Sequence, residues 1–250
     1  LIGYAIVEAL CEMPQMNVRY SLNDGKPAID ERAHVGFGLA IDIQHAGERR
    51  LVVPVIHQAD TLTFTGFVEA YQDIISRAKA GSLSAEDYQG ATVTLTNPGT
   101  IGTTTSVPRL MNGQGVIIGV GAMDYPAEFA GVSPRKLALL GIGKTMFVSS
   151  TYDHRVIQGA ASGDFLRLLD LKLSGRDGFY DRVFTALHIP VPPYTWEADF
   201  EYDLEREKGK PARIAELIQA YRSRGHLAAD TDPLAYRVRR HPDLNLSTYG

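Results

Sequence analysis

The chain has 250 residues, of which 44% are hydrophobic, and its formal net charge is −4. This length suits one large domain, or one domain with part of another, and the charge excludes a general electrostatic attraction to nucleic acid. No run of about 18 apolar residues predicts a membrane span, and the single cysteine, Cys11, excludes an intramolecular disulfide and indicates a reducing, cytoplasmic location.

The first part of the chain predicts one helix followed by three strands. Their expected positions are 2–13, 17–22, 34–43 and 49–56. Pro14 ends the helix, and Asn23–Lys26 reads as a turn after the first strand. The chain opens at Leu1 within the helical pattern and has no basic leader, so we expect a fragment that begins inside a helix.

The next part predicts two helices, at 64–81 and 163–175, and three strands, at 91–97, 115–123 and 145–152. Residues 98–113 are rich in Thr, Gly and Pro, which predicts a long loop. Hairpin-like links join some of the strands and helices join others. The pattern therefore predicts an α/β domain with a mixed sheet rather than a purely parallel one.

The composition changes near residue 175. We therefore predict a mixed α/β domain over 1–175 and a helical, charged and partly irregular segment over 176–250. A helix is expected at 212–227. Its inward residues are expected to be Ile214, Leu217, Ile218 and Tyr221, with Arg213, Glu216 and Arg222 outside.

The stretch TYDHRVIQGA at 151–160 places a histidine between an acid and an arginine. Alternate side chains of a strand share a face, so Asp153 and Arg155 are expected to pair while His154 points the other way. A neutral imidazole titrates near pH ~6.5 and can act as a base. The alternative is a strand-end histidine that is hydrogen-bonded to the backbone.

The second candidate feature is TLTNPG at 94–99, where the Thr96 hydroxyl ends a strand and is a possible oxyanion donor. An ordinary surface threonine is the alternative. The seven histidines form no HExxH motif, so no metal site is predicted. Two glycine-containing stretches, GVGAMD and GKT, lack the spacing of nucleotide-binding loops.

Taken together, the two features are specific. YDHRVIQG resembles the DHRxxDG signature of the acyltransferase components of 2-oxo-acid dehydrogenase complexes, and TLTNPGTIG resembles that family's TITNxGxxG. The order and the separation of roughly sixty residues also match, and the resemblance covers 1–173. It implies a chloramphenicol acetyltransferase-like fold and homotrimers whose active sites lie between subunits. It also implies that coenzyme A and the acyl-lipoyl group enter from opposite ends of a channel.

The segment IAELIQAYRSRGHLAADTDPL is similar to the N-terminal helical region of the thiamine-dependent 2-oxoglutarate dehydrogenase component. A fusion of this kind resembles actinobacterial multifunctional enzymes of 2-oxoglutarate metabolism. The resemblance implies an acyltransferase domain at 1–175 and the start of a dehydrogenase/decarboxylase region at 176–250. Thiamine diphosphate and Mg²⁺ would then bind outside this chain. As a local alternative, Arg224 and His226 would face the thiamine site.

The resemblance implies succinyl transfer between a dihydrolipoyl thioester and coenzyme A, as part of the tricarboxylic acid cycle. His154 would be the base, Thr96 the oxyanion donor, and Gln158 stands where the family usually has Asp or Asn. The expected partners are a lipoyl-bearing carrier, a dihydrolipoamide dehydrogenase component and further copies of this chain. A second hypothesis is a catalytically degenerate scaffold or regulatory domain that supports thiamine-dependent decarboxylation.

Overall fold

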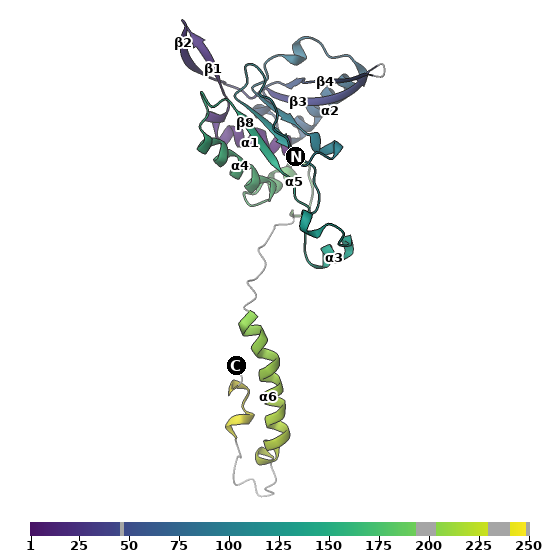
Figure 1. Cartoon of the computed structure of the whole chain (residues 1–250), viewed down its shortest axis with the longest axis vertical. Coiled ribbons are helices and arrows are strands. Elements are labelled where there is room, and N and C mark those ends of the chain that lie inside the picture. Colours follow the sequence, from purple (N-terminus) through teal and green to yellow (C-terminus); the bar gives the residue numbers. More distant parts are fainter. Residues whose placement is uncertain (46–47, 194–203, 230–240, 249–250) are drawn as a thin grey trace. The chain divides into compact units, whose positions relative to one another are not determined.

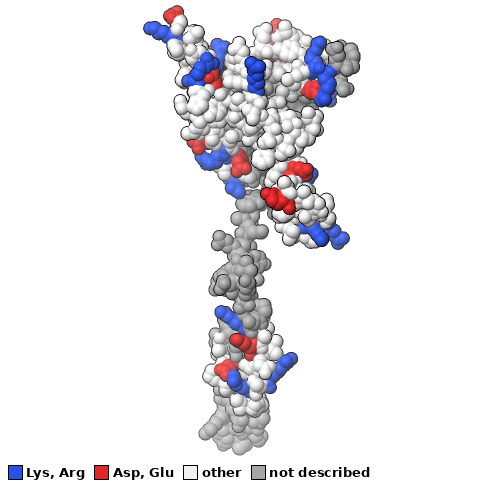
Figure 2. All heavy atoms as spheres, viewed as in Figure 1, with Lys and Arg blue, Asp and Glu red and all other residues white. Residues whose placement is uncertain are grey.

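The computed structural model describes residues 1–45, 48–193, 204–229 and 241–248. The chain divides into two compact units, residues 1–196 and residues 197–250 (Figure 1). Among the described residues, no helix is both long enough and apolar enough to cross a membrane. Basic and acidic side chains are interspersed on the face of the first unit shown in Figure 2, with broad uncharged areas between them.

A six-stranded mixed sheet forms the centre of the first unit. Its strands are β3 (Phe37–His45), β4 (Glu48–Val52), β5 (Val55–Ile56), β6 (Val93–Thr96), β7 (Val116–Val120) and β8 (Val148–Tyr152). The order is β4-β3-β6-β7-β8, with β5 also pairing β3. The β3–β6 and β6–β7 pairs are parallel and the others are antiparallel, which confirms the predicted mixed sheet.

Helices complete the core of this unit. They are α1 (Ile2–Glu12), α2 (Phe64–Ala80), α4 (Gly159–Leu173) and α5 (Phe179–Ala186). The short α3 (Pro134–Leu139) lies apart from them, in a segment that projects from the unit (Figure 1). The α2 helix starts at Thr63, whose hydroxyl accepts a hydrogen bond from the Gly66 amide, and stops at Gly81 in the left-handed conformation. Large buried side chains join the layers, among them Phe37 of β3, Ile118 of β7 and Phe165 of α4.

Strands β1 (Val18–Asn23) and β2 (Lys26–Glu31) form a separate antiparallel hairpin that projects from the unit (Figure 1). Asp24 and Gly25 both have positive φ, as a two-residue turn matched to the strand twist requires. The sequence predicted the turn but not the returning strand, because Pro27 and the charged residues around it weaken its β pattern.

The loop that follows β6 folds over the sheet. Gly99 passes close to Gly121, the residue directly after β7, so that a Cβ at position 99 would lie 2.3 Å from the Gly121 carbonyl carbon. Ser149 of β8 donates a hydrogen bond to the Ser106 carbonyl at 2.7 Å. The predicted long loop is therefore packed against β7 and β8, and its glycines permit that close approach.

A fully enclosed lysine links three helical segments. Lys172 of α4 has a side-chain exposure of 0%, and its ammonium contacts carboxylates of Glu12 and Glu8 on α1 and of Asp177 before α5. Arg182 of α5 joins the same cluster through Glu8 at 2.7 Å. Burial would lower the pKa of Lys172, but the carboxylates of Glu12 and Asp177 outweigh that effect and raise it. The ammonium therefore stays charged.

We expect Lys172→Met to lower the free energy of unfolding by about 2–4 kcal/mol at pH 7, because it leaves the carboxylates without their shared cation. Urea unfolding followed by circular dichroism measures this. Arg167→Met, an exposed charge on the same helix, is the control and should change stability by less than about 0.5 kcal/mol.

The pH dependence of the Lys172→Met effect has a defined direction. Burial acts to raise the pKa of Asp177, yet its hydrogen bond from Lys172 lowers the pKa overall, whereas the pKa of Lys172 is raised. The stabilisation is thus present between about pH 4 and pH 10. It is lost as the pH falls through the lowered pKa of Asp177 or rises above the ordinary lysine value. An equal loss of stability at pH 2 and pH 7 would contradict this assignment.

In the second unit, α6 (Leu204–Ala228) contacts the short turn η6 (Pro242–Leu244), which in turn contacts the following turn, η7 (Leu246–Thr248). The prediction that Ile214, Ile218 and Tyr221 point inward was wrong, since all three are exposed. The described part of this unit offers only a narrow packing surface, which buries Ala220 and Leu244 instead. Tyr221 still donates its hydroxyl hydrogen to the Leu244 carbonyl at 3.0 Å.

Candidate active site

Thr96 is the last residue of β6. It pairs with Ala40 of β3 and Gly119 of β7, so it sits in the middle of the sheet at the carboxyl end of two parallel strands. The turn after it is closed by Thr100, whose hydroxyl donates to the Asn97 carbonyl at 3.1 Å. Among the described residues the Thr96 hydroxyl has no hydrogen-bond partner, and it is therefore available to a ligand.

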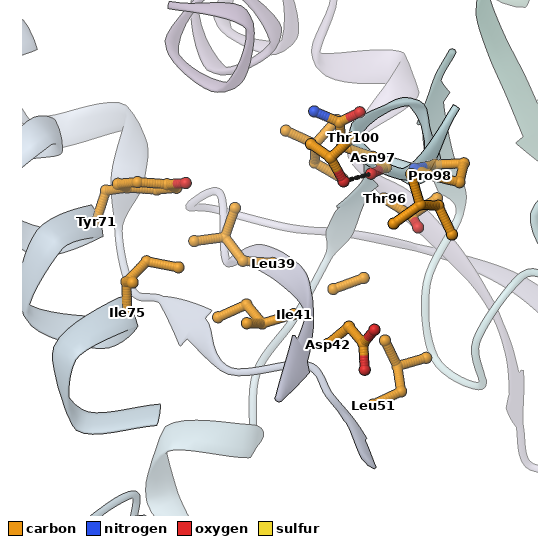
Figure 3. A pocket seen from close by; sticks show the side chains of 13 residues that line it. Leu39, Ile41, Asp42, Leu51, Tyr71, Ile75, Thr96, Asn97, Pro98 and Thr100 are labelled. Atoms are coloured by element: carbon orange, nitrogen blue, oxygen red, sulfur yellow. Dashed lines mark hydrogen bonds between the residues drawn. The ribbon is translucent and has the colours of Figure 1, made fainter. Parts of the chain in front are cut away.

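An open cavity of about 570 Å³ adjoins Thr96 (Figure 3). Its walls come from α2, β3, β4 and the turn after β6. The lining side chains include Tyr71, Ile75, Leu39, Ile41, Leu51, Asn97 and Pro98. They are mostly apolar, with Thr96 and Asp42 as the polar exceptions on the strands. A mainly apolar cavity of this size with a few polar groups is typical of small-molecule sites.

His154 lies in a tight turn directly after β8 and is exposed to solvent. The ring is 5.4 Å from the Tyr152 ring, centroid to centroid, and has no hydrogen-bond partner among the described residues. The turn is held by the Asp153 carbonyl, which accepts from the Val156 and Ile157 amides at 3.0 and 2.9 Å. Burial of Ile157 anchors the turn to the core and leaves the imidazole facing outward.

The predicted pairing of Asp153 with Arg155 is confirmed, although it occurs in the turn rather than along a strand. The Arg155 Nε and Nη2 atoms donate to the Asp153 carboxylate at 2.9 and 2.6 Å. These hydrogen bonds from Arg155 lower the pKa of Asp153, so the pair stays ionised at neutral pH. The ion pair brackets His154 on both sides in sequence.

Sequence reasoning missed a third member of this arrangement. Tyr20 on the β1–β2 hairpin lies under the Arg155 guanidinium, whose carbon is 3.8 Å from the ring centroid. This is a close cation–π contact, and it ties the projecting hairpin to the turn that carries His154. The only signal in the sequence was an aromatic residue in a polar strand, which gives no indication of its partner.

If the sequence-based assignment of His154 as the base holds, we expect Tyr20→Leu to lower kcat about tenfold, because loss of the contact with Arg155 loosens the turn that carries His154. Tyr20→Phe keeps the aromatic face and should retain most of the wild-type rate. Steady-state kinetics with both variants, together with their melting temperatures, measures this. Equal rates for Leu and Phe would remove Tyr20 from the arrangement.

Gln158 precedes α4 and has an exposed side chain that makes no capping hydrogen bond. The turn before α4 is held by Asp153. The Gln158 carbonyl accepts from the Ser162 amide at 3.1 Å and so begins the helix. Its amide group, four residues after His154, remains free to face a partner or ligand.

The sheet register separates Thr96 from His154 within one chain. Thr96 is level with Gly119, and Gly119 is level with Ser149, which is five residues before His154. Strand β8 ends at Tyr152, three residues past Ser149, so at about 3.3 Å per strand residue the turn that carries His154 begins about 10 Å from the level of Thr96 along the strands and two strands away across the sheet. A single chain therefore does not bring them to one substrate.

No group of three or more His, Cys, Asp or Glu side chains in the described ranges is arranged to hold a metal ion. In the second unit, Arg224 forms an ion pair with Asp243, and His226 lies exposed near the end of α6.

Comparison with known proteins gives a consistent result. The sequence profile of the 2-oxoacid dehydrogenases acyltransferase (catalytic domain) family matches residues 1–175. A multifunctional 2-oxoglutarate metabolism enzyme of Mycobacterium sp. (strain JLS) is 55% identical over 254 residues, covering 100% of this chain and 20% of the relative. The multifunctional 2-oxoglutarate metabolism enzyme of Mycolicibacterium vanbaalenii is 53% identical, again over 100% of this chain and 20% of the relative. The chain thus spans about a fifth of the length of these relatives.

Solved structures agree on the fold. A probable dihydrolipoamide acetyltransferase from Listeria monocytogenes has a TM-score of 0.54 and 25% identity, covering 77% of this chain and 72% of that one. The Azotobacter vinelandii dihydrolipoamide acetyltransferase, studied for the catalytic roles of a serine, a histidine and an asparagine, has a TM-score of 0.54 and 27% identity. That match covers 68% of this chain and 65% of the other. The chain therefore belongs to the 2-oxoacid dehydrogenase acyltransferase family and carries its catalytic domain.

Proposed function

We propose that this domain transfers a succinyl group between a dihydrolipoyl thioester and coenzyme A, at sites formed by His154 of one chain and Thr96 of another. The proposal rests on two side chains that lack hydrogen-bond partners among the described residues and lie at opposite ends of one sheet, in a chain that belongs to the acyltransferase family. The name of the mycobacterial relatives supports 2-oxoglutarate, and hence the succinyl group, as the source of the acyl unit.

The chemistry assigned to each residue follows from its position. His154, exposed on its turn, takes the proton of the attacking thiol, which at a pKa of about 8.5 is mostly protonated at neutral pH. The thiolate attacks the thioester carbonyl carbon, and the Thr96 hydroxyl donates to the oxygen that becomes negative. When the carbon–sulfur bond of the leaving thiol breaks, His154 returns the proton to that sulfur.

The Azotobacter enzyme was investigated for a histidine and an asparagine that are four residues apart, the spacing of His154 and Gln158 here. We propose that Gln158 takes the asparagine's place beside the substrate. Gln is neutral and one methylene longer than Asn, so it offers hydrogen bonds without a charge that would stabilise an imidazolium.

The assembly implied by this site includes several copies of the chain. A site split between chains requires an oligomer, and a structure of the cubic core of a pyruvate dehydrogenase complex is among the related folds, at 27% identity and a TM-score of 0.53. We propose a homotrimer as its unit. The acyl group would arrive on a lipoyl-bearing carrier, and a dihydrolipoamide dehydrogenase component would reoxidise that carrier in the cytoplasm.

We further propose that residues 1–175 are the acyltransferase domain and residues 176–250 begin the thiamine-dependent dehydrogenase/decarboxylase region of a longer protein. The mycobacterial relatives, which extend well beyond the matched region, support this. Thiamine diphosphate and Mg²⁺ would bind beyond this chain. Calorimetry of the chain with thiamine diphosphate and Mg²⁺ should detect no binding, and a clear binding signal would place that site here instead.

A direct assay tests the acyltransferase proposal. The chain is incubated with succinyl-dihydrolipoamide and coenzyme A, and succinyl-coenzyme A formation is followed with time. Turnover well above the buffer rate supports the proposal. A folded, oligomeric chain that gives no turnover would favour the second candidate, a scaffold for decarboxylation, for which the neutral Gln158 is the motivating observation.

A further inference from the structure

A second cavity, which is polar, lies at the end of the sheet opposite Thr96. It measures about 210 Å³, and it is bordered by the base of the β1–β2 hairpin and by the segments that lead into β6 and β7. Its polar lining residues are Arg19, Arg32, Tyr88, Asn112 and Gln114. Arg19 is neutralised by Asp30 at 2.5 Å, whereas Arg32 reaches the same carboxylate only at 3.9 Å.

Unpaired buried atoms are concentrated around this cavity. In the described part of the chain four buried side-chain atoms lack a hydrogen-bond partner, and three of them are Asn17 Oδ1, Arg32 Nε and Gln114 Oε1. Arg32 and Gln114 line the cavity, and Gln114 is only 5% exposed. Buried polar atoms are normally paired, so their gathering beside an open space indicates a polar guest.

The donors and acceptors are well defined. Asn17 donates through Nδ2 to the Arg32 and His34 carbonyls at 3.3 and 3.1 Å, which fixes its amide and leaves Oδ1 as the unpaired acceptor. Arg32 Nε is a donor. The guest must therefore both accept a hydrogen bond, from Arg32, and donate one, to Gln114 or Asn17. An anion would satisfy only the first requirement.

The cavity also lies next to the His154 turn. The Asp153 amide donates to the Gly115 carbonyl at 2.8 Å, immediately beyond the Val116–Tyr152 pair. Gly115 in turn packs against β1, where a Cβ would lie 2.0 Å from the Val18 carbonyl oxygen. Gln114 and Asn17 thus directly precede Gly115 and Val18, the two residues through which β7, β1 and the turn that carries His154 contact one another.

We propose that Arg32 and Gln114 bind a secondary amide in the arm of the thiol substrate whose sulfur meets His154. The amide oxygen accepts from Arg32 Nε, and the amide N–H donates to Gln114 Oε1. This inference rests on the proposed function. Both thiol arms of that reaction contain a secondary amide, whose nitrogen lies two carbons from sulfur in the pantetheine arm and farther from it in a carrier-bound lipoyl arm.

Paired substrates that differ only in the amide test this. For the pantetheine arm, succinyl transfer to N-acetylcysteamine is compared with transfer to its ester analogue 2-mercaptoethyl acetate, which lacks the N–H. For the lipoyl arm, the N-methylamide of dihydrolipoic acid is compared with the methyl ester of dihydrolipoic acid. We expect wild type to favour the amide about tenfold or more in kcat/KM within one series. The series that shows the preference identifies the arm.

The variants assign the preference to residues. Gln114→Leu should abolish the amide preference, whereas Arg32→Met should lower kcat/KM about tenfold for amide and ester alike in that series and leave the other series unchanged. Lys26→Met removes an exposed charge from the same hairpin and should change neither. Melting temperatures of all three variants identify any that fail to fold.

Contrary outcomes are distinct. Three outcomes overturn the assignment: no amide preference in either wild-type series, a preference that survives Gln114→Leu, or wild-type rates in Arg32→Met. If wild type transfers no succinyl group at all, the proposed function fails separately. Calorimetry with pantetheine and with the N-methylamide of dihydrolipoic acid, comparing wild type and Arg32→Met, then decides the amide site without turnover, and equal affinities of the two proteins for both ligands would reject it.

Discussion

Replacing His154 with alanine is expected to lower kcat for succinyl transfer about 10²–10⁴-fold, the usual contribution of a positioned general base. The ring is exposed, and its one aromatic neighbour among the described residues is Tyr152, so the substitution should leave the melting temperature nearly unchanged. The measurement is the rate of succinyl-coenzyme A formation at saturating substrate, with circular dichroism to check the fold.

His57→Ala is the matched control for that experiment. His57 is also exposed, but it lies after β5 beside Gly90, away from the turn that follows β8. It should keep the wild-type rate. A His154→Ala chain that is as fast as wild type would end the enzymatic role of this turn and leave the scaffold hypothesis.

Mixing two inactive variants is expected to restore activity. Thr96→Ala alone should lose about 10²–10³-fold, since one oxyanion donor is removed. If each site takes His154 from one chain and Thr96 from the next, refolding equal amounts of His154→Ala and Thr96→Ala chains together produces some sites with both residues intact. In a closed ring with random assembly, about one quarter of the sites are complete, so about a quarter of the wild-type rate should return.

Each variant refolded with itself is the control for the mixture and should remain at its own low rate. Recovery should also require dissociation and reassembly, so simply combining the two preformed oligomers should give none at first. A mixture that never exceeds the average of its components would show that Thr96 and His154 do not meet across chains.

Local patterns predicted most of the first unit because its elements have strong periodicity and clear ends. The α2 helix carries a hydroxyl cap at Thr63 and a left-handed glycine at Gly81, and it lies where its apolar stripe predicts a helix. The α3 helix was missed, although Ser133 caps it and Pro134 opens it, because six residues are too few to establish a helical stripe. The exposure of Ile218 was also missed, since a stripe predicts a buried face only where a packing surface exists.

The candidate site was only partly predictable. The motifs supplied Thr96 and His154, and they suggested that both act on one substrate. Their distance depends on the register of β6, β7 and β8, which the sequence does not encode locally. The contact between Tyr20 and Arg155 joins residues more than a hundred positions apart, and neither residue carries a local signal of the other. The unpaired Gln114 became visible only through burial.

The placement of Thr96 and His154 at opposite sheet ends has a genetic consequence. Every polypeptide would serve two neighbouring reaction centres, lending a base to one and a hydroxyl to the other. A defective allele carrying both substitutions would therefore be partially dominant when expressed beside an intact one. Output in such a cell would fall with the square of the intact gene product's share, more steeply than dosage alone predicts.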